Sequence, residues 1–275
     1  MTEKIKGKPV AFSIISTLIL SAFLIGITLF FRGRFEEHDL IVPMLISTVL
    51  NIVFAALAAY LLGVINQVNG FRFVFKTKGL AKGLLVLIPV ATFFIFGSII
   101  NTDLTSEANI ENVWFLPVTA FMQATSALMQ NVLFRGLLVT ALLIKLSGTE
   151  KERVRGVFRA SALYLIIYIP LNILNGSGIG LMQIINTFIV GAGFCAAYLY
   201  SKNLMSLVLV QGAWQISDSV IYFLGFERHT LFSLPLFIAL VAILILIVVF
   251  AVRFSKRAEP FFCHNSPHTV RLYKT

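Results

Sequence analysis

The stretch VWFLPVTAFMQATSALMQNVLFRGLLVTALLIK, residues 113–145, is apolar enough to cross a bilayer but carries Arg135 near its middle. A charge at that depth costs about 2.5 to 3.5 kcal/mol on insertion scales, so it is normally retained together with a partner. The expected partner is a carboxylate one helical turn away, on the same helix face. That position, Asn131, is an amide. The stretch therefore raises the question of what holds the arginine.

The composition is that of a membrane protein. Of the 275 residues, 58% are hydrophobic and only 12% are charged, and the mean hydropathy is +0.92. Ordinary soluble domains carry about 25% charged residues. A segment in lipid has no water to bond, so its backbone N–H and C=O groups must bond to each other, as they do in an α-helix. The sequence therefore predicts an all-α polytopic membrane protein.

Eight apolar segments reach the length of roughly 20 residues that a membrane helix needs. Their predicted limits are 10–31, 40–64, 83–100, 113–145, 158–174, 181–200, 206–224 and 230–252. The fourth is too long for one simple crossing, so we expect it to tilt, bend or project from the bilayer.

Loop charges predict the orientation of these spans. Every even-numbered connection is basic, as are both ends of the chain, whereas the third loop carries Asp103, Glu107 and Glu111 and no base. Basic residues collect in cytoplasmic loops. We therefore expect both termini in the cytoplasm. The same rule accounts for the net charge of +10, so nucleic acid is not an expected partner.

Few charged side chains lie deep in the predicted spans. All four histidines fall in loops or the tail, and the deep charges are Arg135 and Asp218. Amides and phenols occur there instead, in pairs four residues apart that share a helix face. Such deep pairs are Asn131 with Arg135, Tyr164 with Tyr168, and Gln211 with Gln215.

Three helices bring these groups to a similar predicted depth. Arg135, Tyr168 and Gln211 each lie nine or ten residues from a basic residue at the cytoplasmic end. That separation is roughly 14 Å along a helix. Interhelical hydrogen bonding alone would explain such a layer. Deep polar groups are, however, also candidates for a functional site.

The pattern resembles the CPBP family, also called Abi, of CAAX prenyl proteases and bacteriocin-processing enzymes. Its motifs are E-E-x-x-x-R, then F-x-x-x-H, then H-x-x-x-N or H-x-x-x-D. QNVLFRG (130–136) matches the first in frame, YLIIY (164–168) the second and QGAWQ (211–215) the third. The resemblance covers about residues 113–224. It implies a CAAX-protease-like core of eight membrane helices, in a cell membrane and most simply a bacterial plasma membrane.

Neutral groups occupy the motif positions where the family has acids and histidines. They are Gln130, Asn131, Tyr168, Gln211 and Gln215, whereas Arg135 is kept. In active relatives the first glutamate is thought to activate water, with histidine assistance. An amide cannot take a proton from water at neutral pH, and a metal site needs imidazole, thiolate or carboxylate ligands. We therefore expect no catalytic residue, no metal and no cofactor.

This chemistry favours a pseudoprotease. We interpret the chain as a degenerate family member that binds and regulates a membrane protein, peptide or lipid through a neutral polar intramembrane pocket. Immunity to a bacteriocin is one role that the family suggests. Tyr164 is expected beside that pocket, and Asp218 is expected as a counter-ion of Arg135, bridged by water.

Two alternatives stay open at this point. The chain is an active CAAX-type endopeptidase that uses Asp218, its one deep carboxylate, or it is a small-molecule or lipid transporter whose path the amides line. No internal repeat is visible, which weakens the transporter reading.

The resemblance also suggests a division of the chain. Residues 1–112 hold the first three membrane helices, 113–224 the family core, 225–252 the last helix and 253–275 a basic cytoplasmic tail. In the tail, Cys263, His264 and His268 lie together, but three such ligands make a weak metal site, and the sequence does not fix their role.

Overall fold

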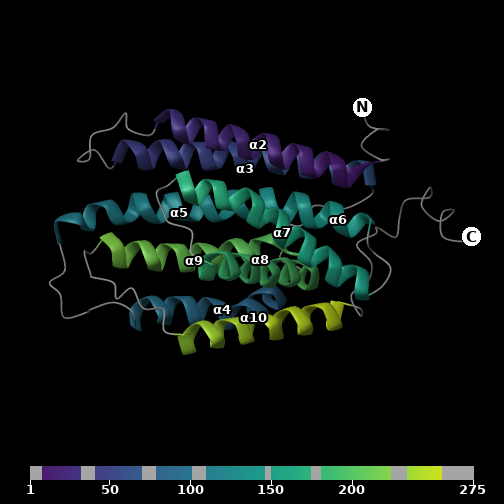
Figure 1. The fold of residues 1–275 in the computed structure, drawn as a ribbon. Coiled ribbons are helices and arrows are strands. Elements are labelled where there is room, and N and C mark those ends of the chain that lie inside the picture. The colour runs from purple at the N-terminus through teal and green to yellow at the C-terminus, as the bar shows by residue number, and fades with distance from the viewer. Residues whose placement is uncertain are drawn as a thin grey trace, which may run out of the picture.

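The structure is a computed structural model, and it describes residues 8–31, 41–69, 79–100, 110–145, 150–174, 181–223 and 234–255. These residues form helices, with no strand among them (Figure 1). The α-helices are α2 (Pro9–Phe31), α3 (Ile41–Asn69), α4 (Leu80–Ile100), α5 (Leu116–Gln130), α6 (Thr140–Lys145), α7 (Glu150–Leu174), α8 (Leu181–Ser201), α9 (Leu204–Phe223) and α10 (Leu234–Ser255). The predicted all-α fold is confirmed.

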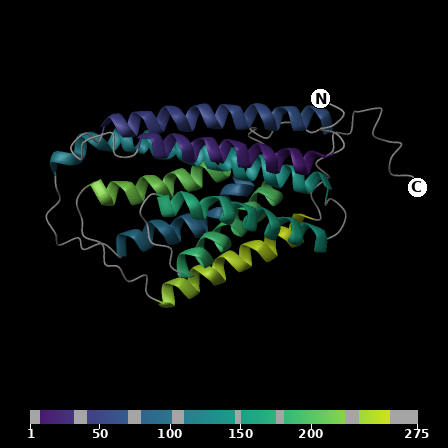
Figure 2. The same ribbon diagram turned by 45° about the horizontal axis from the view of Figure 1, so that its top comes forward.

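The helices lie side by side in layers, with successive long helices running in opposite directions (Figures 1 and 2). One face is made by α2 and α3, and the opposite face by α4 and α10. The helices α5, α7, α8 and α9 lie between them. This arrangement places the later part of the chain, which carries the three motifs, in the centre of the bundle.

Five helical segments are long and apolar enough, by length and composition alone, to cross a membrane. Within the described residues they are Val10–Phe31, Ile41–Ile65, Val113–Leu142, Ile184–Ser201 and Leu204–Ile221. Two more apolar stretches, Leu80–Phe96 and Ile238–Phe254, are shorter. Helix α7 begins with charged turns at Glu150–Arg159, eight residues before the predicted span at 158. The chain is thus a multi-pass membrane protein, as expected.

The outer helices present large apolar side chains outward. Phe23 of α2, Val49 of α3 and Leu246 of α10 are each more than half exposed in the isolated chain. Contiguous apolar surface of this kind is rare on soluble monomers. On a polytopic bundle it is the surface that faces lipid.

The long fourth span is one continuous helical rod that changes type along its length. A 3-10 turn, η1 (Ile110–Phe115), leads into α5, and a π-helix, η2 (Asn131–Val139), separates α5 from α6. Whether this long span tilts, bends or projects from the bilayer stays a prediction. Gly136 permits close packing around the π-helix, because a Cβ there would lie 2.9 Å from Leu62 Cδ2 and 3.2 Å from Leu204 Cδ1.

A two-residue turn between α8 and α9 fixes the height of the third motif. Lys202 adopts a left-handed conformation with φ 55°. Asn203 then caps α9, since its Oδ1 accepts a hydrogen bond from the Ser206 backbone N–H at 3.2 Å. An amide at this position is a preferred helix N-cap.

The described basic residues, Arg135 excepted, lie at one end of the bundle. They occur at the starts of α2, α4 and α7, at the ends of α6 and α10, and in the turn before α9. Figure 1 shows that these helix ends share one side. Which side is cytoplasmic stays a prediction. Asp103 and Glu107 of the third loop, and the tail with Cys263, His264 and His268, lie outside the described residues, as does most of segment 253–275.

Candidate functional site: a buried arginine held by amides and rings

The π-helix η2 forms the centre of the candidate site. All nine of its residues are buried, and the segment touches α2, α3, α7, α8 and α9. Short π-helical segments inside α-helices frequently occur at functional sites. Here the segment starts at Asn131 and includes Arg135, so two polar residues of the first motif, QNVLFRG (130–136), project from it.

The Arg135 guanidinium is 2% exposed and is bound by two neutral amides. Its Nη1 donates to Gln211 Oε1 at 2.8 Å and to Asn131 Oδ1 at 3.1 Å. Asn131 Nδ2 also donates to Gln211 Oε1, at 3.1 Å, and to the Ala127 carbonyl, at 2.8 Å. Hydrogen bonds to a charged group are stronger than neutral ones. Carbonyl oxygens of amides thus take the place that a carboxylate would have.

Two aromatic rings enclose the other surfaces of the guanidinium. Its carbon Cζ lies 5.0 Å from the centre of the Tyr164 ring and 4.9 Å from that of Phe194. Both separations are within the range of cation–π attraction, which is stronger where the cation is removed from water. Arg135 is therefore stabilised by the negative faces of two rings in addition to its amide partners.

The cation also orients the amides farther along the network. Because Gln211 Oε1 faces Arg135, its Nε2 donates to Gln130 Oε1 at 2.5 Å. Gln130 Nε2 then donates to Ser126 Oγ at 3.1 Å. An amide oxygen only accepts and its nitrogen only donates. The positive charge therefore sets the direction of a chain of hydrogen bonds from η2 through α9 and back to α5.

The remaining predicted site residues lie beside this network. Tyr168 stacks on Tyr164, with ring centres 5.1 Å apart, and so lies beside the ring that covers Arg135. Gln215, one turn from Gln211, has a buried Oε1 with no hydrogen-bond partner. Asp218 lies seven residues after Gln211, which is roughly 10 Å along α9. Its expected role as a water-bridged counter-ion of Arg135 stays a prediction.

No group of three His, Cys, Asp or Glu side chains that could hold a metal ion occurs among the described residues. The four histidines all lie outside these ranges. The expectation that this site takes no metal and no cofactor accordingly stays a prediction.

The sequence reasoning missed two contributors to the site. The first is the π-helix itself, which no periodicity indicated. The second is Phe194, whose ring covers Arg135 from α8. It lies in the small-residue stretch GAGFCAA (191–197), where a single large side chain between small ones was the available signal.

Comparison with known proteins gives one match. Residues 112–217 match the family model described as type II CAAX prenyl endopeptidase Rce1-like. Neither the curated proteins nor the solved structures contain a match. The matched segment runs from η1 to α9, contains all three motifs and ends one residue before Asp218. It confirms the resemblance drawn from the motifs, since residues 112–217 are similar to the Rce1-like CAAX prenyl endopeptidase family.

Proposed function

We propose that this protein is a catalytically degenerate CAAX-protease-like membrane protein, which binds a membrane partner in a neutral polar pocket and regulates it without cutting it. The observation that carries the proposal is the set of Arg135 contacts. Asn131 and Gln211 hold the cation through their oxygens, and neither amide can act as a general base at neutral pH.

Gln130 supports the same conclusion. It stands where the family's first glutamate is expected, and both ends of its amide are already engaged, by Gln211 and by Ser126. A general base needs a free acceptor of adequate basicity within reach of the water that it activates. The Gln130 amide instead serves to extend the hydrogen-bond network.

Two unpaired acceptors on helices α8 and α9 suggest what the pocket binds. Gln215 Oε1 on α9 and Asn186 Oδ1 on α8 are buried side-chain atoms without a partner. A buried acceptor left unsatisfied is costly. A partner that offers N–H or O–H donors, such as the backbone of a transmembrane or leader peptide, would remove that cost. We place the protein in a bacterial plasma membrane, where such partners occur.

Absence of proteolysis is the first test. Purified protein in proteoliposomes should leave an isoprenylated peptide and a leader-type peptide intact, as judged by mass spectrometry. Cleavage that disappears in Gln130→Ala but persists in Gln123→Ala, a second glutamine two turns away, would refute the proposal. Cleavage that disappears in Asp218→Asn would instead establish the endopeptidase alternative.

Capture of the partner is the second test. A photo-reactive residue at Gln215 leaves the Arg135 contacts intact and sits beside the network. The matched control is the same probe at Leu209, on the same helix but 48% exposed to lipid. A defined protein or peptide adduct at 215 alone is expected. Identical bulk-lipid adducts at both positions would contradict a partner-binding pocket.

A further inference from the structure

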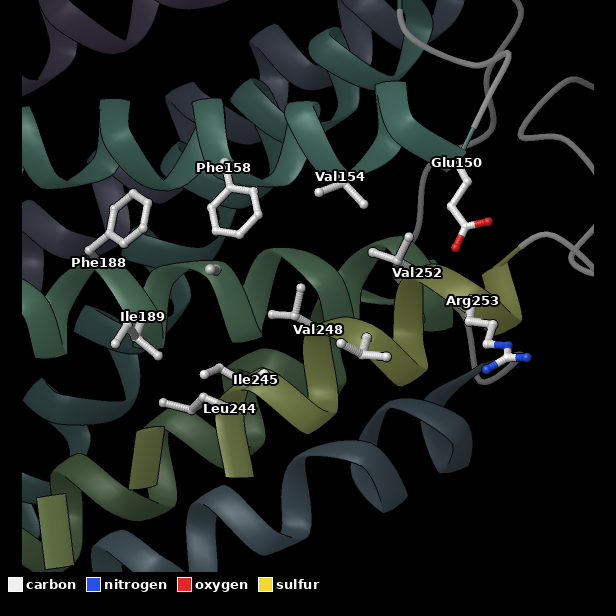
Figure 3. A pocket seen from close by; sticks show the side chains of 12 residues that line it. Glu150, Val154, Phe158, Phe188, Ile189, Leu244, Ile245, Val248, Val252 and Arg253 are labelled. Atoms are coloured by element: carbon white, nitrogen blue, oxygen red, sulfur yellow. The ribbon is translucent and has the colours of Figure 1, made fainter. Parts of the chain in front are cut away.

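A second, separate binding region lies on the opposite side of α8 from Arg135. We call it the α7–α10 groove; it has a volume of about 550 Å³, and its walls include Val154 and Phe158 of α7, Phe188 and Ile189 of α8, and Val248 of α10 (Figure 3). This volume falls in the usual range of ligand sites, about 300–1,000 Å³. Helices α7 and α10 both pack on α8 but scarcely on each other, so α8 forms the floor between them.

The groove and the Arg135 site do not share a face of α8. Phe194 covers Arg135, whereas Ala192 lines the groove. Two residues apart on a helix means roughly 200° of rotation. Occupation of the groove is therefore a property independent of the proposed function.

The two ends of the groove differ in chemistry. Glu150 and Arg253 stand at one end, as Figure 3 shows. Phe158 and Phe188 stand toward the other, stacked with ring centres 5.9 Å apart. Leu244 and Arg253, both in the lining, are nine residues apart, so the groove extends roughly 13 Å along α10.

The charged end coincides with the basic end of the bundle. Lys151 and Arg155 are exposed on the first turns of α7, and Arg253 is in the last turn of α10. Basic groups at this level attract anionic lipid headgroups. Glu150 is an acid among these bases and opposes that attraction.

We propose that the α7–α10 groove binds one acyl chain of an anionic glycerophospholipid from the surrounding bilayer, with the phosphate on Arg253 and the chain end against the Phe158–Phe188 pair. The occupant follows from the surroundings, since lipid chains are the medium against which an apolar groove between membrane helices opens. The preference for an anionic headgroup follows from the basic residues at the charged end of the groove. The stacked rings of Phe158 and Phe188 limit how far the acyl chain can enter.

The role of the charged end of the groove, at Glu150 and Arg253, is tested by measuring which lipids stay bound to the purified protein. Full-length protein in neutral detergent is given equal amounts of phosphatidylglycerol and phosphatidylethanolamine with the same chains, and native mass spectrometry counts what stays bound. Preference for phosphatidylglycerol should fall about fivefold in Arg253→Gln, the effect of one basic group near the headgroup. It should be kept in Arg253→Lys and rise in Glu150→Gln. The control Lys8→Gln, at the same end of the bundle just before α2, should leave it unchanged.

The groove itself is tested by filling it. Val248→Trp should abolish the retained lipid, whereas Ile238→Trp, on the same helix but outside the groove, should not. Equal retention of the two lipids by the unmodified protein would overturn the headgroup assignment. Equal loss in the two tryptophan variants would overturn the groove, as would displacement of the lipid by an isoprenylated peptide at equal concentration. If Val248→Trp does not fold, the Arg253 and Glu150 variants still decide the proposal.

Discussion

Arg135 remains in the bilayer core because neutral groups can hold a cation when enough of them converge. Two amide oxygens and two ring faces surround the guanidinium. Each contributes less than a carboxylate would, but none adds a second charge that must itself be removed from water. The arginine in turn fixes the orientation of Gln211 and Gln130, so its loss affects the whole polar layer.

Two glutamines of this chain allow a hydrogen bond to the charged Arg135 to be compared with a hydrogen bond to a neutral group. Gln211→Leu removes an acceptor from Arg135 and should lower the free energy of unfolding by about 2 kcal/mol, as for hydrogen bonds to charged groups. Gln123 bonds the neutral Ser219 Oγ at 2.8 Å, so Gln123→Leu should cost only about 0.6 kcal/mol, an average value between membrane helices. Reversible unfolding in mixed micelles measures both. Equal costs would mean that Arg135 is not held by Gln211.

The ring contacts make a separate prediction. Tyr164→Phe removes the phenol oxygen but keeps an aromatic face over Arg135, whereas Tyr164→Leu removes that face as well and should cost about 1 kcal/mol or more beyond Tyr164→Phe. The comparison of the two variants in the same unfolding assay cancels most of the loss of packing. If Tyr164→Phe is as harmful as Tyr164→Leu, the phenol oxygen and not the ring is the contribution that matters.

At the scale of elements, the fourth span shows where close packing replaces regular winding. Both α3 and α9 approach η2 at Gly136, and the leucines that meet there, Leu62 and Leu204, are fully buried. A regular helix with a larger residue would keep these neighbours farther away. The close packing at Gly136 is thus part of the contact between η2 and α9, from which Arg135 reaches Gln211.

Glycine replacements test that contact. Gly136→Ala places a methyl group 2.9 Å from Leu62 Cδ2, and overpacking of this kind costs about 1 to 3 kcal/mol. Gly63→Ala is the matched control in the facing helix, because nothing lies within 4 Å of its Cβ. It should be neutral or stabilising by up to about 1 kcal/mol. The difference in melting temperature between the variants measures the effect. If both melt alike, the helices do not approach closely at Gly136.

At the scale of the whole molecule, hydropathy predicted the all-α membrane class and the approximate limits of the helices. These are properties that lipid imposes segment by segment, so a single sequence contains them. The sequence predicted a similar depth for Arg135 and Gln211, because depth follows from counting residues along each helix. The hydrogen bond between them is consistent with that depth. The π-helix and the Phe194 contact depend on how three helices pack together, which no local pattern reports.

The arrangement of the bundle predicts which ends share a side of the membrane. With Cys263 replaced by serine and Cys195 buried, single cysteines at Lys8, Trp114 and Phe254 report on the two ends of the bundle. Trp114 is 86% exposed at the start of the fourth span, and the other two lie at the basic end of the bundle. An impermeant maleimide added to intact cells should label only the cysteine at 114. Labelling at 8 and 254 but not at 114 would invert the predicted orientation. Labelling at 8 without 254 would mean an odd number of crossings, which the alternating helix directions do not allow.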